Sequence, residues 1–314
     1  MKGALFIFAL WGVLFALVPI VVDYATRKEF IVHSSGAIIV TGASTGIGNH
    51  AAIHLATQHP LTTIYAGIRK DKDAEAIAAL NMPNLLPLKL DTTDQASMDA
   101  AVAQVLTTGI PVIGLVNNAG VSNNSPLEFL PMPKLRQLLE TNVVGPTYLT
   151  QKLTPALRAS QGRVVQISSV LGKVTLATRG AYSASKHAFE ALSDVFRLEL
   201  ANFGVSVSIV EPAYVKTEIF GKVQQDIDGM KSAELLELYG PLYYRADQAK
   251  KKQKQIEGGD SPMVTSEAIE HAMFHRFPKT RYVVANFAGI PADVCLYLNW
   301  LMPDRLLDLV KSKM

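Results

Sequence analysis

Two residues four positions apart, Tyr182 and Lys186, form a pair that could move a proton. They lie in a stretch of good helix formers without Pro or Gly, so their side chains face the same way. A free phenol has a pKa near about 10, too high for an efficient base at neutral pH, but a neighbouring ammonium stabilises the phenolate. Tyr182 could then act as a general acid or base. Taken alone, this spacing is more often a plain helix surface.

A second chemical feature is a glycine-rich turn near the start of the chain. Thr41–Gly48 follows the short apolar stretch Ala37–Val40 and precedes a helical sequence, which indicates a strand, turn and helix. Gly42 permits a tight turn, Gly46 lets backbone amides approach a pyrophosphate, and Gly48 allows the next helix to pack closely. The amino end of that helix offers free N–H donors to an anion. The turn therefore predicts a dinucleotide site.

The elements that must position these residues alternate between strand and helix. Further strands are predicted at Thr63–Ala66, Leu86–Leu90, Ile113–Val116, Arg163–Ile167 and Val205–Val210. This alternation is typical of an α/β protein with a Rossmann-type, doubly wound parallel sheet and helices on both faces. At 314 residues, the chain suits one such domain, which we place at residues 36–290. Its ligand crevice is expected at the carboxyl ends of the strands.

Six motifs occur in the order and approximate spacing of a known family. They are Thr41-Gly-x-x-x-Gly46-x-Gly48, Asn117-Asn-Ala-Gly120, Asn142, Ser169, Tyr182-x-x-x-Lys186 and Pro212-x-x-x-x-Thr217. Between Gly36 and Phe220 the chain thus resembles the short-chain dehydrogenase/reductase family. The apolar amino terminus and the motifs Arg281-Tyr282 and Leu306-Leu-Asp308 resemble, more narrowly, its retinol dehydrogenase and 17β-hydroxysteroid dehydrogenase branch.

The resemblance implies an enzyme that moves a hydride between a nicotinamide cofactor and a CH–OH or carbonyl group. Tyr182 would exchange a proton with the substrate oxygen, and Ser169 would polarise the carbonyl. The backbone carbonyl of Asn142 would hold a water connected to Lys186. Ser168 competes with its neighbour for the substrate role, but strand alternation would turn its side chain to the opposite side.

The same resemblance assigns the cofactor site and indicates which cofactor binds. The implied residues are Gly42, Ser44, Thr45, Gly46, Ile47, Gly48, Arg69, Asp91, Asn118, Ala119, Gly120, Tyr182, Lys186, Pro212, Val215 and Thr217. Ile68 stands where a carboxylate would bind the ribose of NAD, and a guanidinium follows it, which suits a 2′-phosphate. NADP(H) is therefore favoured, with NAD(H) as the alternative. Asp91 would bind the adenine edge, or else cap a turn.

The amino terminus predicts a membrane anchor. Residues 4–22 carry no charge, and a helix of that length spans about 28 Å, close to the bilayer core. We expect a single-pass protein, in the endoplasmic reticulum if the source is eukaryotic, with residues 23–35 as connector. A cleaved signal is the rival interpretation, and flanking charges do not decide the orientation. The one cysteine, Cys295, favours a reducing compartment for the catalytic domain.

Two later segments depart from the alternating pattern. Residues 218–260 are rich in Gly and Lys and are interpreted as a lid over a substrate pocket. Residues 291–314 form an apolar tail that either packs on the core or rests on the membrane.

Composition and spacing argue against other functions. A net charge of +3, with 49% hydrophobic and 18% charged residues, is unlike a nucleic-acid-binding protein. The pairs His50/His54 and His271/His275 have helical spacing but lack an obvious third ligand, so no metal site is predicted. The partner is expected to be a lipophilic small molecule such as a steroid or retinoid. The alternatives are a 3-ketoacyl or 3-ketosphingoid reductase, or a non-catalytic cofactor-binding scaffold, and a homodimer is expected by resemblance.

Overall fold

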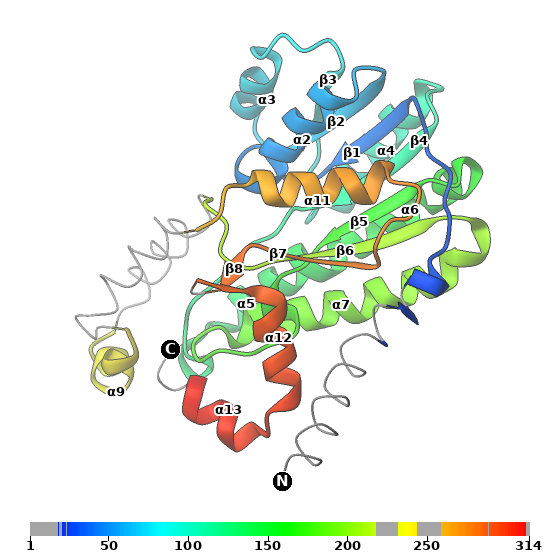
Figure 1. Ribbon diagram of the computed structural model, residues 1–314. Helices are drawn as coiled ribbons and strands as arrows, with labels where there is room; N and C mark the ends of the chain where they lie inside the picture. The colour runs from blue at the N-terminus through cyan, green and yellow to red at the C-terminus, as the bar shows by residue number, and fades with distance from the viewer. Residues whose placement is uncertain are drawn as a thin grey trace, which may run out of the picture.

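The computed structural model describes residues 18, 21–22, 24–217, 232–243, 259–287 and 289–311. A seven-stranded sheet with the order β3-β2-β1-β4-β5-β6-β7 forms its centre (Figure 1). Each neighbouring pair in this sheet is parallel. The strands are β1 Gly36–Val40, β2 Thr62–Ile68, β3 Leu85–Lys89, β4 Val112–Asn117, β5 Arg163–Ile167, β6 Ser206–Pro212 and β7 Arg281–Val284. The predicted Rossmann-type α/β fold is thereby confirmed.

Helices cover both faces of the sheet, and an apolar core lies under each layer. Their bounds are α2 Gly46–Gln58, α3 Asp71–Ala78, α4 Gln95–Thr107, α5 Met132–Leu139, α6 Gly145–Ser160, α7 Gly180–Leu200 and α11 Met263–Phe274. One core joins α2 and α11 to the sheet through residues such as Leu55 and Ile269. The other joins α4 and α6 to it through residues such as Val105 and Leu153. Buried apolar side chains on alternating sides of the strands require both layers.

The strand order reverses at β1, and this position creates the crevice. Val40, the last residue of β1, pairs with Ala66 of β2 on one side and with Val116 of β4 on the other. The connection after β1 leads to β2 on one side of the sheet, whereas the connection after β3 leads to β4 on the other side of β1. Because these connections diverge, a space opens beyond the carboxyl ends of β1 and β4. The glycine-rich turn begins at Thr41 and therefore enters this space.

One strand of the seven-stranded sheet was not predicted. β7, Arg281–Val284, closes the β6 edge of the sheet, with Val210 paired to Tyr282. It has only four residues, too few to show a distinct apolar run. Sequence analysis had noted Arg281-Tyr282 only as part of a family resemblance.

Parts of the predicted anchor and lid lie outside the described residues. Only Val18, Val21 and Val22 of the predicted anchor are described. Among the helices that the structure describes, none is both long and apolar enough to span a bilayer. Within the predicted lid, the described part is α9 Ala233–Tyr243 and residues 259–260. The α9 helix meets the short 3-10 helix η1, Leu127–Phe129, where the hydroxyl of Tyr239 donates a 2.6 Å hydrogen bond to Glu128.

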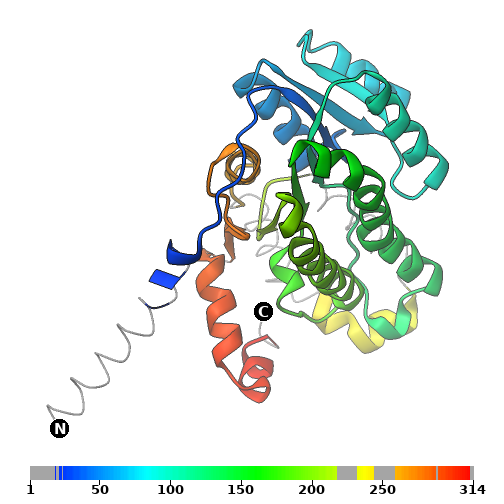
Figure 2. The same ribbon diagram turned by 90° about the vertical axis from the view of Figure 1, so that its right-hand side faces the viewer.

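The predicted tail consists of two short helices beside a small hairpin. β8 Asn286–Phe287 pairs with β9 Ile290–Pro291, and α12 Ala292–Leu301 and α13 Asp304–Lys311 follow. Both helices project away from the sheet, drawn in red in Figure 2. They bury few side chains, among them Leu307, and leave Trp300 and Leu309 exposed by 70% and 63%.

Candidate active site

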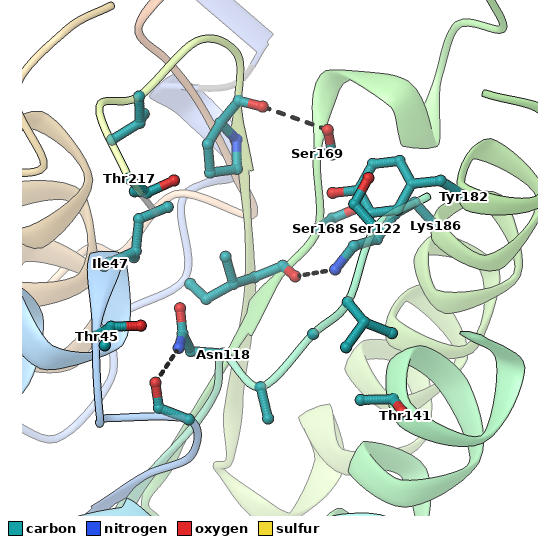
Figure 3. A pocket seen from close by; sticks show the side chains of 18 of the residues that line it. Thr45, Ile47, Asn118, Ser122, Thr141, Ser168, Ser169, Tyr182, Lys186 and Thr217 are labelled. Atoms are coloured by element: carbon teal, nitrogen blue, oxygen red, sulfur yellow. Dashed lines mark hydrogen bonds between the residues drawn. The ribbon is translucent and has the colours of Figure 1, made fainter. Parts of the chain in front are cut away.

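Tyr182 and Lys186 lie one turn apart on α7 and face the carboxyl end of β5. The ammonium of Lys186 donates a 2.8 Å hydrogen bond to the carbonyl oxygen of Ile167 and lies 5.9 Å from the ring centroid of Tyr182. Ser169 follows β5, and its hydroxyl lies near Tyr182, where it favours the phenolate. Figure 3 shows these three side chains gathered on one wall of the cavity. The structure therefore brings together three of the four residues predicted to be catalytic at the point where chemistry would occur.

The protonation of this group is governed mainly by burial. Burial raises the pKa of Tyr182, while the hydrogen bond from Ser169 and the charge of Arg179 oppose that rise. Burial also lowers the pKa of Lys186 to about 8, and the charge of Glu190 opposes that fall. For the protein without cofactor, burial sets the net direction, and Lys186 is not among the groups that shift the pKa of Tyr182. The low-dielectric surroundings disfavour the phenolate more strongly than the nearby cations favour it.

Asn142 occupies a single π-helical turn, η2 Glu140–Val144, between α5 and α6. Its side-chain amide accepts a 2.8 Å hydrogen bond from the backbone N–H of Val121 and donates one of 2.8 Å to the carbonyl of the same residue. It also donates to the hydroxyl of Ser185 on α7, at 3.0 Å. Asn142 thus ties the segment after β4 to the helix that carries Tyr182.

The glycine-rich turn provides a cradle for an anion. Gly42 and Gly46 have positive φ angles of 64° and 62°, a conformation that favours glycine. The α2 helix begins at Gly46, its N-cap residue Thr45 makes no side-chain capping hydrogen bond, and its first turn has no acidic residue. The free N–H groups and the positive end of the helix dipole point into the crevice. This arrangement fits the pyrophosphate of a dinucleotide.

Gly48 has a role beyond the predicted close packing of the helix. A Cβ at this position would lie 2.2 Å from Nδ2 of Asn118 and 2.5 Å from the carbonyl oxygen of Gly42. The amide of Asn118 donates to the carbonyls of Thr41 and Gly42, at 2.9 and 3.2 Å. The missing side chain at Gly48 therefore makes room for the amide that braces the turn, in addition to any packing of the helix.

The cavity extends from this turn to Tyr182 along the carboxyl ends of the strands. The cofactor residues predicted from the sequence that line it are Gly42, Ser44, Thr45, Gly46, Ile47, Arg69, Asp91, Asn118, Ala119, Gly120, Tyr182, Lys186, Pro212, Val215 and Thr217. Gly48 lies behind this lining, and Asn142 is buried beside it. Ser169, Tyr182, Lys186 and the glycine turn thus face one continuous space.

Two charged residues at the end of the cavity predicted to hold adenosine differ in their contacts. Arg69 directly follows β2, lines the cavity and is exposed, so its guanidinium is available to a phosphate. Asp91 also lines the cavity, but its Oδ1 accepts hydrogen bonds from the N–H and the hydroxyl of Thr93, at 2.9 and 2.7 Å. The turn-capping alternative for Asp91 is therefore present in the structure.

The segment after β6 closes the other side. Val215 forms a parallel bridge with Asp260, and the N–H of Lys216 donates to the carbonyl of Asp260 at 3.0 Å. A Cβ on Gly46 would lie 3.4 Å from Cβ of Thr217. The segment that would meet a nicotinamide thus lies against the glycine turn.

Sequence analysis missed Arg179 as a member of the site. Arg179 lines the cavity, and its Nη1 donates to the carbonyl of Asn123 at 3.1 Å and approaches the hydroxyl of Ser122 at 3.4 Å. Its charge favours the phenolate of Tyr182. The signal was its position three residues before Tyr182, which places both on neighbouring parts of one helix surface.

The first predicted histidine pair, His50/His54, and the nearby His59 make polar contacts with α11. His54 and His59 approach the two carboxylate oxygens of Glu270, at 2.7 and 3.0 Å, and His50 approaches the hydroxyl of Ser266 at 2.7 Å. Over the described ranges, no three His, Cys, Asp or Glu side chains are grouped so that they could hold a metal ion.

Comparisons with known proteins agree with this geometry. The family model for short chain dehydrogenases matches residues 36–228. The NADPH-dependent 3-dehydrocapnine reductase of Ornithobacterium rhinotracheale is 36% identical over 284 residues, covering 88% of this chain and 95% of that protein. The 17-beta-hydroxysteroid dehydrogenase type 6 of Bos taurus is 32% identical, covering 85% and 90%. Human retinol dehydrogenase 16 is 33% identical, covering 87% and 86%.

A solved structure resembles the whole domain. The short-chain dehydrogenase from Streptomyces avermitilis aligns with a TM-score of 0.69 and 28% identity, covering 90% of this chain and 98% of that one. Residues 36–228, which the family model matches, contain both the glycine-rich turn and the group around Tyr182. The chain therefore belongs to the short-chain dehydrogenase/reductase family and is an NAD(P)-dependent oxidoreductase.

Proposed function

We propose that this protein interconverts a lipophilic alcohol and its carbonyl compound, with Tyr182 as the general acid and base. The observation that carries the proposal is the contact of Tyr182 with Ser169 beside the ammonium of Lys186. These groups line the same cavity as the anion cradle at the start of α2. A proton donor and a hydride carrier would therefore meet at one substrate carbon.

Each residue of the group has a distinct part in the proposed reaction. In reduction, the hydroxyl of Tyr182 gives its proton to the carbonyl oxygen, and in oxidation the phenolate takes the proton back. Ser169 donates a hydrogen bond to the same oxygen and orients the substrate. Bound NADP(H) would supply or accept the hydride. Lys186 stabilises the phenolate, and Asn142 holds the neighbouring backbone and anchors the water that returns protons to Lys186.

The comparisons favour NADP(H) as the cofactor, since the relative with 36% identity is named as NADPH-dependent. Ile68 and Arg69 at the end of β2 agree with that preference, because they offer a cation and no carboxylate near the expected 2′-phosphate. NAD(H) is the alternative cofactor.

The proposed substrate is a steroid, a retinoid or a similar lipid. The names of the steroid and retinol dehydrogenases support this class. We further propose that residues 1–22 anchor the protein in a membrane, that 23–35 connect the anchor to the domain at 36–290, and that 218–260 form a substrate lid. The exposed apolar side chains of α12 and α13 within the 291–314 tail support a location where such lipids partition. An endoplasmic reticulum location and a homodimer are further parts of this proposal.

Reduction of a 3-ketoacyl or 3-ketosphingoid compound is the second candidate. It is favoured by the relative named as a 3-dehydrocapnine reductase. The two candidates differ only in the shape and polarity of the substrate that reaches Tyr182. They share the same residues for proton transfer.

The test is a substrate screen with the purified full-length chain. NADPH or NADH oxidation would be followed with steroid, retinoid and 3-ketoacyl carbonyl compounds, and the products would be identified. The Tyr182→Phe variant should lose about 100-fold or more in kcat while it still binds NADPH. Turnover that persists in this variant would contradict the mechanism. Cofactor binding without turnover of any of these substrates would favour the scaffold alternative.

A further inference from the structure

The α7 helix carries a third buried group in line with Tyr182 and Lys186. Glu190 lies four residues after Lys186, so the three side chains share one face of the helix. Lys186 and Glu190 are exposed by only 4% and 3%. A buried carboxylate is rare unless a cation compensates it. The position of Glu190 directly behind the proposed proton-handling pair is therefore a feature that needs an explanation.

Two cations from other elements hold Glu190 in place. Its Oε2 accepts contacts from Nζ of Lys173 at 3.0 Å and from Nη2 of Arg281 at 3.2 Å. The guanidinium of Arg281 also bridges to Asp194 at 2.6 Å and to Glu211 at 3.2 Å. The other oxygen of Glu190, Oε1, is buried without a donor among the described side chains. Glu190 is thus fixed by a network that joins α7 to β6 and β7.

The charged and titratable groups on the face of α7 that carries Lys186 and Glu190, and on the elements packed against it, come from four elements. They are Tyr182, Glu190 and Asp194 on α7 with Arg179 at its start, Lys173 after η3 (Val170–Gly172), Glu211 on β6 and Arg281 on β7. The hydrogen-bond partner of the ammonium is a neutral carbonyl, that of Ile167. Of the surrounding groups, Glu190 is the one whose charge opposes the effect of burial on Lys186.

The neighbouring carboxyl, Glu211, has a strongly perturbed pKa. Burial, followed by the charge of Glu190, raises the pKa of Glu211 to about 7. Below this pH the carboxyl of Glu211 is neutral and adds no second negative charge beside Glu190.

We propose that Glu190 is a positioning residue that keeps the buried side chain of Lys186 in its ammonium form. This inference rests on the proposed function, in which that ammonium stabilises the phenolate of Tyr182. Without a charged carboxylate one turn away, burial would drive Lys186 toward the neutral amine. Lys173 and Arg281 hold Glu190 in place.

The test measures the protonation of Lys186 directly in the full-length chain. Lysines isotope-labelled at Nζ would be titrated by NMR, and the Lys186 signal would be assigned by its absence in Lys186→Met. We expect Glu190→Gln to lower the pKa of Lys186 by about 1, because an opposing charge has been removed nearby. The conservative Glu190→Asp should restore part of the difference. This measurement needs neither cofactor nor substrate.

Glu211→Gln is the matched control. It makes the same chemical change in an equally buried residue that contacts the same Arg281, and it should leave the pKa of Lys186 within about 0.3 of wild type. An unchanged Lys186 in Glu190→Gln, or equal shifts in the two variants, would overturn the inference. If instead wild-type protein turned over no ketone while the Lys186 shift was observed, the proposed function would fail and the electrostatic role of Glu190 would stand.

A second readout is the pH profile of turnover. The ammonium exists below its pKa and is lost as pH rises, so the alkaline limb of kcat/KM should move to lower pH in Glu190→Gln by about the same 1 pH unit. A structural defect alone would lower activity at every pH without moving that limb.

Discussion

The ammonium of Lys186 is tied to the carbonyl oxygen of Ile167, the last residue of β5, by a hydrogen bond of 2.8 Å. This bond fixes α7 relative to the strand that leads into Ser169. The hydroxyls of Ser169 and Tyr182 can therefore approach one substrate oxygen from two separate elements. Such positioning by rigid elements is what general acid–base catalysis requires.

The first prediction concerns the charge of Lys186. Its pKa is about 8 because burial lowers it, so the cation is present below that pH and lost as pH rises through it. In Lys186→Arg the side chain stays charged at every accessible pH. We expect kcat to fall by about tenfold or more because the geometry changes, but the loss of kcat/KM above about pH 8 should vanish. An alkaline limb that persists at the same pH in the variant would assign it to another group.

The second prediction concerns the glycine-rich turn. Gly48→Ala would place a Cβ 2.2 Å from the amide of Asn118, so Asn118 must leave the carbonyls of Thr41 and Gly42. Overpacking of this kind costs about 1–3 kcal/mol, and we expect NADPH affinity to fall by about tenfold. Calorimetric titration of the purified protein measures the change. Gly240→Ala is the control, since a Cβ there meets nothing within 4 Å, and equal losses in both variants would contradict the assignment.

The sheet and the proton-handling pair were predictable because their signals are local. The run of four apolar residues Ala37–Val40, which lies between Ser35-Gly36 and Thr41, indicates a strand without reference to the rest of the chain. The four-residue spacing of Tyr182 and Lys186 fixes their common face in the same way. For the order of the strands, the crossover rules of parallel sheets supply the remaining information.

Features that depend on packing between distant segments were not predictable. Burial in the folded cavity raises the pKa of Tyr182, and no local sequence pattern encodes that burial. The network around Glu190 needs Arg281, a residue 91 positions away in the chain. The contact of Gly48 with Asn118 likewise joins the turn after β1 to the end of β4.

The third prediction concerns cofactor preference. Arg69 is exposed at the end of β2 and lines the cavity, where its guanidinium can pair with a 2′-phosphate. We expect Arg69→Ala to weaken NADPH binding by about tenfold, the effect of one partly exposed charge-assisted hydrogen bond, and to leave NADH binding nearly unchanged. Fluorescence titration with each nucleotide measures both affinities. The neighbouring Lys70→Ala, which does not line the cavity, should change neither, and parallel weakening of both nucleotides in Arg69→Ala would refute a phosphate contact.

The last prediction concerns stability as a function of pH. Burial and the charge of Glu190 raise the pKa of Glu211 from 4.5 to about 7. The folded state therefore binds this proton more tightly than the unfolded state does. The contribution of Glu211 to the free energy of unfolding is full below about pH 4.5 and is lost as pH rises to about 7, a change of at most about 3 kcal/mol.

Glu211→Gln removes this titration while it keeps the shape of the side chain. Between pH 5 and pH 8, the difference in the free energy of unfolding, wild type minus variant, should fall as pH rises. Urea unfolding of both proteins at each pH gives the difference directly, because every other titrating group is common to the two. Glu199→Gln, at an exposed position of α7, controls for the loss of one carboxylate that is not buried. A difference between wild type and Glu211→Gln that stays constant with pH would show that Glu211 titrates alike in the folded and unfolded states, contrary to its burial beside Glu190.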